Sequence, residues 1–123
     1  MNCTDFTIMI VEDDLDILKI YEKSLSAEGY RLILAVNDKR ALAELEKSPI
    51  DLLIVDHGVL TILPIIERDY PKLPLIVCSG SFDGLMKDYE KKGFGNVKAF
   101  YLKPESMNVI KLKIREILKI EDF

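Results

Sequence analysis

Hydrophobic residues gather in five short runs along the chain, and the segments between them carry apolar residues with a helical period. The runs predict strands at residues 7–11, 31–36, 52–55, 75–78 and 99–102. Within each run the apolar residues are continuous rather than alternating, which is typical of strands that are covered on both faces. The pattern therefore indicates a parallel sheet between two layers of helices.

The first helix is expected to begin near Asp14 and to close at Gly29. Its inward face is predicted from residues that recur with helical spacing, namely Ile17, Ile20, Tyr21, Ser24 and Leu25. A second helix should start after residue 36, where Asn37 or Asp38 can cap the first turn, and should stop before Pro49.

Two further helices are expected near the C-terminus, at residues 83–92 and 105–119. The second of these has one apolar stripe, formed by Ile110, Ile114, Ile117 and Leu118. Right-handed crossovers between parallel strands then give a doubly wound α/β architecture. We expect a single domain over residues 1–123.

Composition narrows the class of protein. A chain of 123 residues with 49% hydrophobic content fits one core, and a net charge of -4 gives no cationic excess for nucleic-acid binding. Two cysteines, Cys3 and Cys78, are too few for a disulfide framework, and we expect Cys78 to be a buried strand residue. No run resembles a signal peptide or is long enough to span a membrane. The expectation is a reduced cytoplasmic protein with no direct nucleic-acid or membrane binding.

Polar residues follow four of the predicted strands at the point where each should end. They are Glu12, Asp13, Asp56, Ser79 and Lys103. If these strands are parallel neighbours, all five side chains share the carboxyl edge of the sheet. Ligands of doubly wound folds bind at this edge.

The residue types at this edge suit phosphoryl chemistry. Three carboxylates form an oxygen-only site that fits Mg²⁺, which keeps several waters and also binds phosphoryl oxygens. Crowded carboxylates repel one another, so a metal or the Lys103 ammonium is needed to keep Asp56 ionised and nucleophilic. Lys103 can pair with phosphoryl oxygens, and the Ser79 hydroxyl can donate to one.

Four segments carry a resemblance to a known family: residues 8–14 (IMIVEDD), 51–56 (DLLIVD), 77–80 (VCSG) and 100–104 (FYLKP). They are similar to the receiver domain of two-component response regulators, and the resemblance covers nearly the whole chain. It implies a flavodoxin-like receiver fold with five parallel strands in the order 2-1-3-4-5. It also implies a signalling module of a phosphorelay and not an enzyme.

The resemblance implies a role for each edge residue. Asp56 corresponds to the aspartate that is phosphorylated by a histidine kinase or phosphotransfer protein, which makes the chain a phosphoprotein with an aspartyl phosphate. Glu12 and Asp13 correspond to the acidic pair that binds Mg²⁺ together with Asp56. The backbone carbonyl of Gly58 corresponds to a further metal ligand.

The remaining matched positions are implied to transmit the signal. Ser79 corresponds to the hydroxyl residue that engages the phosphoryl group, and Lys103 to the lysine that pairs with it. Phe100 corresponds to the aromatic switch residue, whose rotation changes a surface that binds a downstream effector protein. A phosphorylation-dependent homodimer is a further outcome that the resemblance allows.

The segment after Asp56 departs from the family pattern. It lacks the usual Met-Pro pair and the glycine a few residues later, and only 23 positions separate Asp56 from Ser79, fewer than usual by about two helical turns. Pro64 fits a first helical turn and Pro71 cannot continue a helix, so we expect a short third helix from Pro64 to about Tyr70. This departure favours an alternative, a degenerate receiver that binds partners independently of phosphorylation.

Simpler interpretations remain open for several residues. Asp14, or Asp13, can cap the first helix without any metal. His57 is a neighbour of Asp56 that we do not expect to be essential. A phosphohydrolase with an aspartyl-phosphate intermediate would need a second acid where Gly58 stands, which disfavours an enzyme.

Leu15 and Leu18 lie off the predicted inward stripe of the first helix. In receivers this side of the helix docks the helical phosphotransfer domain of the kinase, so we expect both leucines to contact that partner. The alternative is that they cover the edge of the sheet.

Overall fold

A single parallel sheet organises the computed structural model, which describes residues 2–56, 62–79, 95–102 and 106–120. Its strands are β1 (Thr7–Val11), β2 (Arg31–Ala35), β3 (Leu52–Asp56), β4 (Leu75–Ser79) and β5 (Val97–Leu102). The spatial order is β2-β1-β3-β4-β5, with every neighbouring pair parallel. The predicted strand positions and strand order are confirmed.

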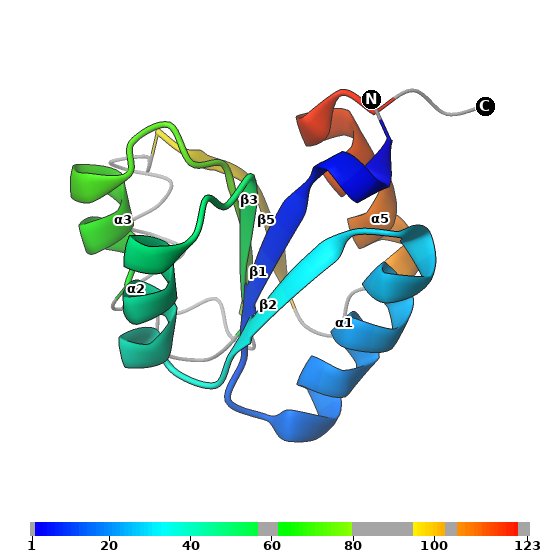
Figure 1. The fold of residues 1–123 in the computed structure, drawn as a ribbon, viewed down its shortest axis with the longest axis horizontal. Helices are drawn as coiled ribbons and strands as arrows, with labels where there is room; N and C mark the ends of the chain where they lie inside the picture. The colour runs from blue at the N-terminus through cyan, green and yellow to red at the C-terminus, as the bar shows by residue number, and fades with distance from the viewer. Residues whose placement is uncertain (1, 57–61, 80–94, 103–105, 121–123) are drawn as a thin grey trace.

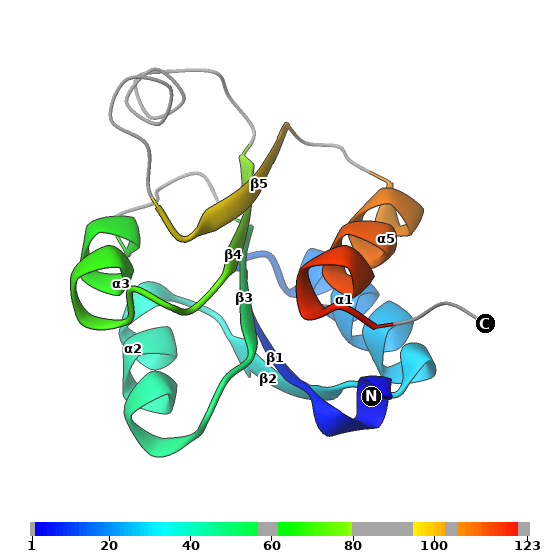
Figure 2. The same ribbon diagram turned by 90° about the horizontal axis from the view of Figure 1, so that it is seen from above.

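Helices cover both faces of the sheet (Figure 1). They are α1 (Leu15–Glu28), α2 (Asp38–Lys47), α3 (Leu63–Asp69) and α5 (Met107–Leu118), and a short 3-10 helix, η1 (Cys3–Asp5), precedes β1. Figure 2 shows α1 and α5 on one face and α2 and α3 on the other. The helix expected at residues 83–92 lies outside the described residues.

Side-chain caps mark where α1 and α2 begin. The Asp14 carboxylate accepts hydrogen bonds from the backbone N–H groups of Asp16 (2.9 Å) and Ile17 (3.3 Å), which are otherwise unsatisfied in a first helical turn. Asn37 caps α2 in the same way through the N–H of Arg40 (2.8 Å). Gly29 ends α1 with a φ of 103°, a left-handed conformation that glycine adopts without strain. Asp14 therefore has the capping role that the sequence left open between Asp13 and Asp14.

The core lies in two layers because successive strand residues point to opposite faces of a sheet. Ile10 and Ile54 pack under α1 and α5, whereas Val11 and Val55 pack under α2 and α3, and all four are fully buried. Burying an aliphatic side chain of this size contributes about 1.5–3 kcal/mol. The continuous apolar runs are explained, since neither face of the central strands is available to polar side chains.

The orientation of α1 differs from the prediction in one respect. Leu18 packs in the core beside Tyr21 and Leu25 and is 5% exposed, whereas Ile20 is 54% exposed. Leu18 and Ile20 lie about 160° apart around a helix, so only one of them can face the sheet. The inward placement of Ile20 was wrong, and Leu18 is a core residue whose side chain is not available for a partner.

The third helix is short, as expected. Pro64 stands in the first turn of α3, where its missing N–H costs no helical hydrogen bond. The backbone N–H of Tyr70 donates to the carbonyl of Ile66 (2.8 Å) and closes the helix. Across the described ranges, no helix is long and apolar enough to cross a membrane.

Candidate functional site

The carboxyl ends of β1 and β3 bring two acidic side chains together. Val11 pairs with Val55 across the two strands, so Glu12, which follows β1, lies next to Asp56, the last residue of β3. Glu12 is 1% exposed and Asp56 is 4% exposed, and the two side chains interact. Asp13 is exposed and also contacts Glu12. The predicted meeting of these acids at one edge of the sheet is therefore observed.

Glu12 is electrostatically unfavourable in its ionised form. Burial raises the pKa of Glu12 to about 7, and the neighbouring Asp56 and Asp13 carboxyls add to this increase. The backbone N–H of Asp14 donates to Oε1 of Glu12 (2.9 Å) and partly offsets the rise in pKa. Glu12 therefore keeps its proton up to near-neutral pH unless a cation is present.

The side chain of Tyr21 completes the contacts on the α1 side. Its hydroxyl donates a hydrogen bond to Oδ2 of Asp56 and lies 3.7 Å from Sγ of Cys78. Burial raises the pKa of Tyr21 well above its usual range, and the Cys78 and Asp56 groups add to the increase, so the hydroxyl remains a proton donor. The sequence placed Tyr21 only in the core. A buried tyrosine hydroxyl needs a hydrogen-bond partner. This requirement is the feature of the sequence that could have indicated a contact between Tyr21 and a polar group of the site.

The chemistry of the donor set fits Mg²⁺. In the described parts of the chain, no group of three or more His, Cys, Asp or Glu side chains is placed to hold a metal ion. Mg²⁺, however, commonly binds through one or two carboxylates and completes its shell with water and phosphate oxygens. Glu12 and Asp56 supply two such carboxylates, and burial beside the Asp56 carboxyl raises the pKa of Glu12. A cation held by this pair would relieve the repulsion.

Other predicted site residues are placed in part or not at all. Ser79 ends β4, where its backbone pairs with Leu102 of β5. Phe100 is half-buried and packs against the core layer under α2 and α3. Gly58 and Lys103, together with His57, lie outside the described residues, so the roles implied for them stay predictions.

One of the two leucines predicted to dock a partner is exposed on the surface of α1 near this edge. Leu15 is the first residue of α1 and is 60% exposed. It begins the helix directly after the Asp14 cap and therefore lies at the same edge of the sheet as Glu12. Of the predicted docking pair, Leu15 is exposed and Leu18 is buried, and the docking role itself stays a prediction.

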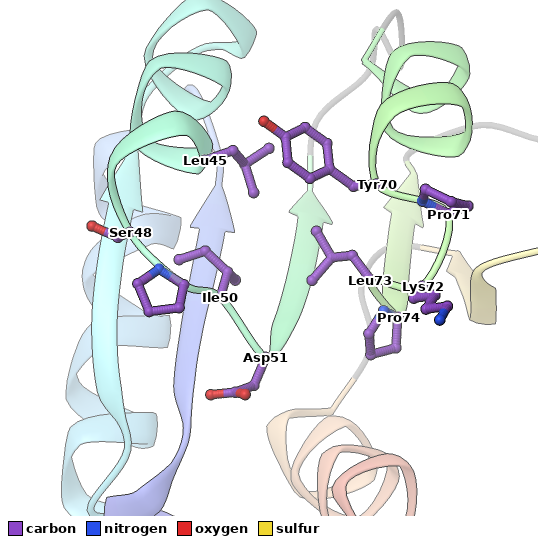
Figure 3. Close-up of a pocket in the computed structure, with 10 residues that line it drawn as sticks. Leu45, Ser48, Ile50, Asp51, Tyr70, Pro71, Lys72, Leu73 and Pro74 are labelled. Atoms are coloured by element: carbon purple, nitrogen blue, oxygen red, sulfur yellow. The ribbon is translucent and has the colours of Figure 1, made fainter.

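A separate cavity of about 540 Å³ lies at the opposite, amino edge of the sheet. Figure 3 shows it between the segment that leads from α2 into β3 and the segment that leads from α3 into β4. Its walls are mainly apolar side chains and prolines, with Asp51 and Lys72 as charged residues. The acidic pair is not part of this cavity.

Comparisons with known proteins found relatives of this chain in sequence and in structure. No protein-family model matches the chain. A response regulator described as NtrX-like from Rickettsia bellii is 31% identical over 128 residues, an alignment that covers 89% of this chain and 26% of that protein. The chain thus spans about a quarter of the length of the curated relatives it matches.

Solved structures show the same fold. The signal receiver domain of an HD domain-containing protein from Pseudomonas fluorescens superposes with a TM-score of 0.82 at 26% identity, covering 93% of this chain and 94% of that chain. The response regulator TrrA from Thermotoga maritima, solved in complex with Mg²⁺-BeF, gives a TM-score of 0.76 at 18% identity, over 91% of this chain and 98% of that chain. This second likeness concerns the fold alone.

The parallel strand order and the helices on both faces of the sheet define a doubly wound α/β domain of the flavodoxin-like type. Together with the similarity in sequence and fold to response regulators, they identify the chain as a receiver domain of the response-regulator family.

Proposed function

We propose that this domain accepts a phosphoryl group on Asp56 from a histidine kinase or phosphotransfer protein, with Mg²⁺ as cofactor. The observation that carries the proposal is the contact between the buried carboxyl groups of Glu12 and Asp56. Two buried acids in contact cost folding free energy, because each loses hydration and each repels the other. A bound cation would offset this cost, and its use in phosphoryl transfer explains why the two acids lie together.

Each residue then has a defined task in the transfer. One carboxylate oxygen of Asp56 attacks phosphorus, and the donor's leaving group departs with the electron pair of the bond that breaks. Glu12, with Asp13, would hold the cation. Bound Mg²⁺ supplies positive charge that stabilises the phosphoryl oxygens during transfer. In this proposal Lys103 and the Ser79 hydroxyl bind the phosphoryl oxygens, and Gly58 contributes its backbone carbonyl to the metal.

The proposed output is a shift between two conformations of the domain. The phosphoryl group draws Ser79 inward, and Phe100, which packs half-buried against the core, rotates into the space that is released. Phenylalanine has no hydroxyl, so this switch works through packing. The altered surface would bind a downstream effector protein or a second copy of the domain.

The exposed position of Leu15 supports a docking role in this proposal. It stands at the start of α1, close to the edge that carries Asp56, where a helical phosphotransfer domain has to approach.

We also place the protein in the cytoplasm. Cys3 and Cys78 are buried free thiols, as expected in a reducing compartment.

Labelling by a small acyl-phosphate donor tests the phosphoacceptor proposal. The wild-type protein should form an acid-stable, base-labile phosphoryl adduct only when Mg²⁺ is present, and the Asp56→Asn variant should form none. Absence of labelling in the wild type at saturating donor and Mg²⁺ would reject the proposed function and leave the fold intact.

A second candidate function is a receiver that signals without phosphorylation. The hydrogen bond from Tyr21 favours it, because one oxygen of Asp56 already has a protein partner. Titration with Mg²⁺ or Mn²⁺ separates the two functions. A metal-dependent rise in melting temperature supports the phosphoacceptor, since a ligand that binds only the folded state must stabilise it.

A further inference from the structure

A tyrosine hydroxyl from α1 is aimed at the proposed phosphoacceptor. Tyr21 donates to Oδ2 of Asp56 across 35 positions of the chain, and both side chains are buried. The ring has few rotatable bonds and packs in the same core layer as Leu18 and Leu25. Core packing therefore directs the hydroxyl at the carboxylate.

Cys78 fills the space beside this hydroxyl. It pairs with Asp56 across β3 and β4, and its Sγ lies 3.7 Å from the Tyr21 oxygen. Sulfur is a weak hydrogen-bond acceptor, whereas a carboxylate is a strong one. The single proton of the hydroxyl is therefore directed to Asp56.

Phosphoryl transfer changes the group that Tyr21 contacts. When one oxygen of Asp56 attacks, an O–P bond forms, the bond from phosphorus to the donor's leaving group breaks, and the leaving group departs with the electron pair. The carboxylate becomes an acyl phosphate, and its other oxygen becomes an uncharged carbonyl. Hydrogen bonds to ionised acceptors are about twice as strong as those to neutral ones. The Tyr21 hydrogen bond is therefore stronger before transfer than after it.

We infer that Tyr21 is a positioning residue that restrains Asp56 in the unphosphorylated state and thereby lowers its reactivity toward phosphodonors. The inference rests on the proposed phosphoacceptor function and adds a regulatory element to the same site. Its hydroxyl stabilises the ionised acceptor more than the acyl phosphate, so it slows transfer. Weak donors would then label the domain poorly, and a docked kinase domain would be the effective donor.

The Tyr21→Phe variant tests this restraint, because it removes the hydroxyl and keeps the ring that packs in the core. Tyr30→Phe is the matched control, since Tyr30 is also a buried tyrosine of this core layer but its hydroxyl does not contact Asp56. With acetyl phosphate below saturation and excess Mg²⁺, we expect the labelling rate constant of Tyr21→Phe to rise on the order of five-fold. Tyr30→Phe should label at the wild-type rate.

A labelling rate in Tyr21→Phe that equals or falls below the wild-type rate would overturn the restraint. An equal rise in Tyr30→Phe would also overturn it, because general loosening of the core would then explain the effect. If the wild type itself does not label, the proposed function fails and the inference fails with it.

A double-mutant cycle on unfolding tests the hydrogen bond without any phosphodonor. Tyr21→Phe should shift the unfolding equilibrium constant of metal-free protein on the order of five-fold more in the Asp56 background than in the Asp56→Asn background. Tyr30→Phe should show the same shift in both. Coupling between Tyr21 and Asp56 without faster labelling would refute the kinetic restraint alone, and absence of coupling would refute the contact on which it depends.

Discussion

Two aspartates stand at opposite ends of β3 and have opposite environments. Asp51 precedes the strand, is exposed, and accepts a hydrogen bond from the backbone N–H of Thr7 (2.8 Å). Asp56 ends the strand, is buried, and contacts Glu12 and the Tyr21 hydroxyl. An exposed aspartate that satisfies a backbone donor costs little to keep, whereas a buried one beside another acid costs folding free energy. Keeping Asp56 at the carboxyl edge of the sheet thus costs folding free energy, whereas keeping Asp51 at the amino edge costs little.

The largest difference between the two aspartates should appear in phosphoryl labelling. Asp56→Asn should reduce Mg²⁺-dependent labelling by an acyl-phosphate donor to background, because the nucleophile is lost. Asp51→Asn should retain labelling, since its amide oxygen still accepts from Thr7 and it lies at the far edge. Autoradiography or intact mass measurement reports both variants. Loss of labelling in Asp51→Asn with a folded circular dichroism spectrum would contradict the division of roles.

The strand between the two aspartates should dominate stability. Ile54 is fully buried under α1 and α5, and Ile54→Ala is expected to lower the free energy of unfolding by about 2–5 kcal/mol through lost burial and a residual cavity. Urea unfolding followed by circular dichroism measures this loss. A cost below about 1 kcal/mol would mean that the core layer collapses around the smaller side chain.

The raised pKa of Glu12 should make the acidic edge sensitive to pH. Between pH 4.5, which is the usual pKa of a glutamate carboxyl, and about pH 7, Glu12 is ionised in the unfolded chain but stays protonated in the folded metal-free chain. The stability that the protonated group contributes is therefore fully present at low pH. As the pH rises to about 7, the free energy of unfolding falls by roughly 1–2 kcal/mol after screening is considered. Above this pH the loss is complete.

Glu12→Gln removes the titrating group and should flatten this part of the pH profile. Unfolding by urea in chelator at pH 5 and pH 7.5 provides the comparison with the wild type. If both proteins show the same change in stability between the two pH values, Glu12 does not carry the effect. Added Mg²⁺ should stabilise the wild type more at pH 7.5, where proton competition for Glu12 is smaller.

A third aspartate gives the smallest expected effect and separates structure from chemistry. Asp14 caps α1, so Asp14→Ala should lower the free energy of unfolding by about 1 kcal/mol. The same variant should keep most of its phosphoryl labelling, because its side chain serves the helix. Thermal melts and labelling on one preparation test both statements. Complete loss of labelling would assign Asp14 to the site.

Local physics made much of the fold predictable from sequence. Apolar runs of four to six residues without alternation are typical of strands buried on both faces, and their short length favours strands over helices. Asp14, Asn37 and Gly29 mark helix ends because their side chains or backbone freedom meet needs within one helical turn. The edge position of Glu12 and Asp56 followed from the same logic, since parallel strands align their carboxyl ends.

The choice between Leu18 and Ile20 needed the tertiary structure. Both lie on partly apolar stripes that share Tyr21 and Leu25, and helical periodicity alone accepts either stripe. The way α1 packs on the sheet and against α5 decides the rotation, and this depends on contacts made far along the chain. The pairing of the Tyr21 hydroxyl with Asp56 follows from that rotation.

By itself the sequence determined the five strands and the helices α1, α2, α3 and α5, the parallel strand order through the family resemblance, and the pair of acids at the carboxyl edge, because these depend on short-range patterns and on strand ends. Only the tertiary structure decided that Glu12 is buried deeply enough to have a raised pKa, that Leu18 belongs to the core, and that Tyr21 contacts Asp56. Burial and side-chain contact are set by residues distant in sequence, so they arise only when the layers pack.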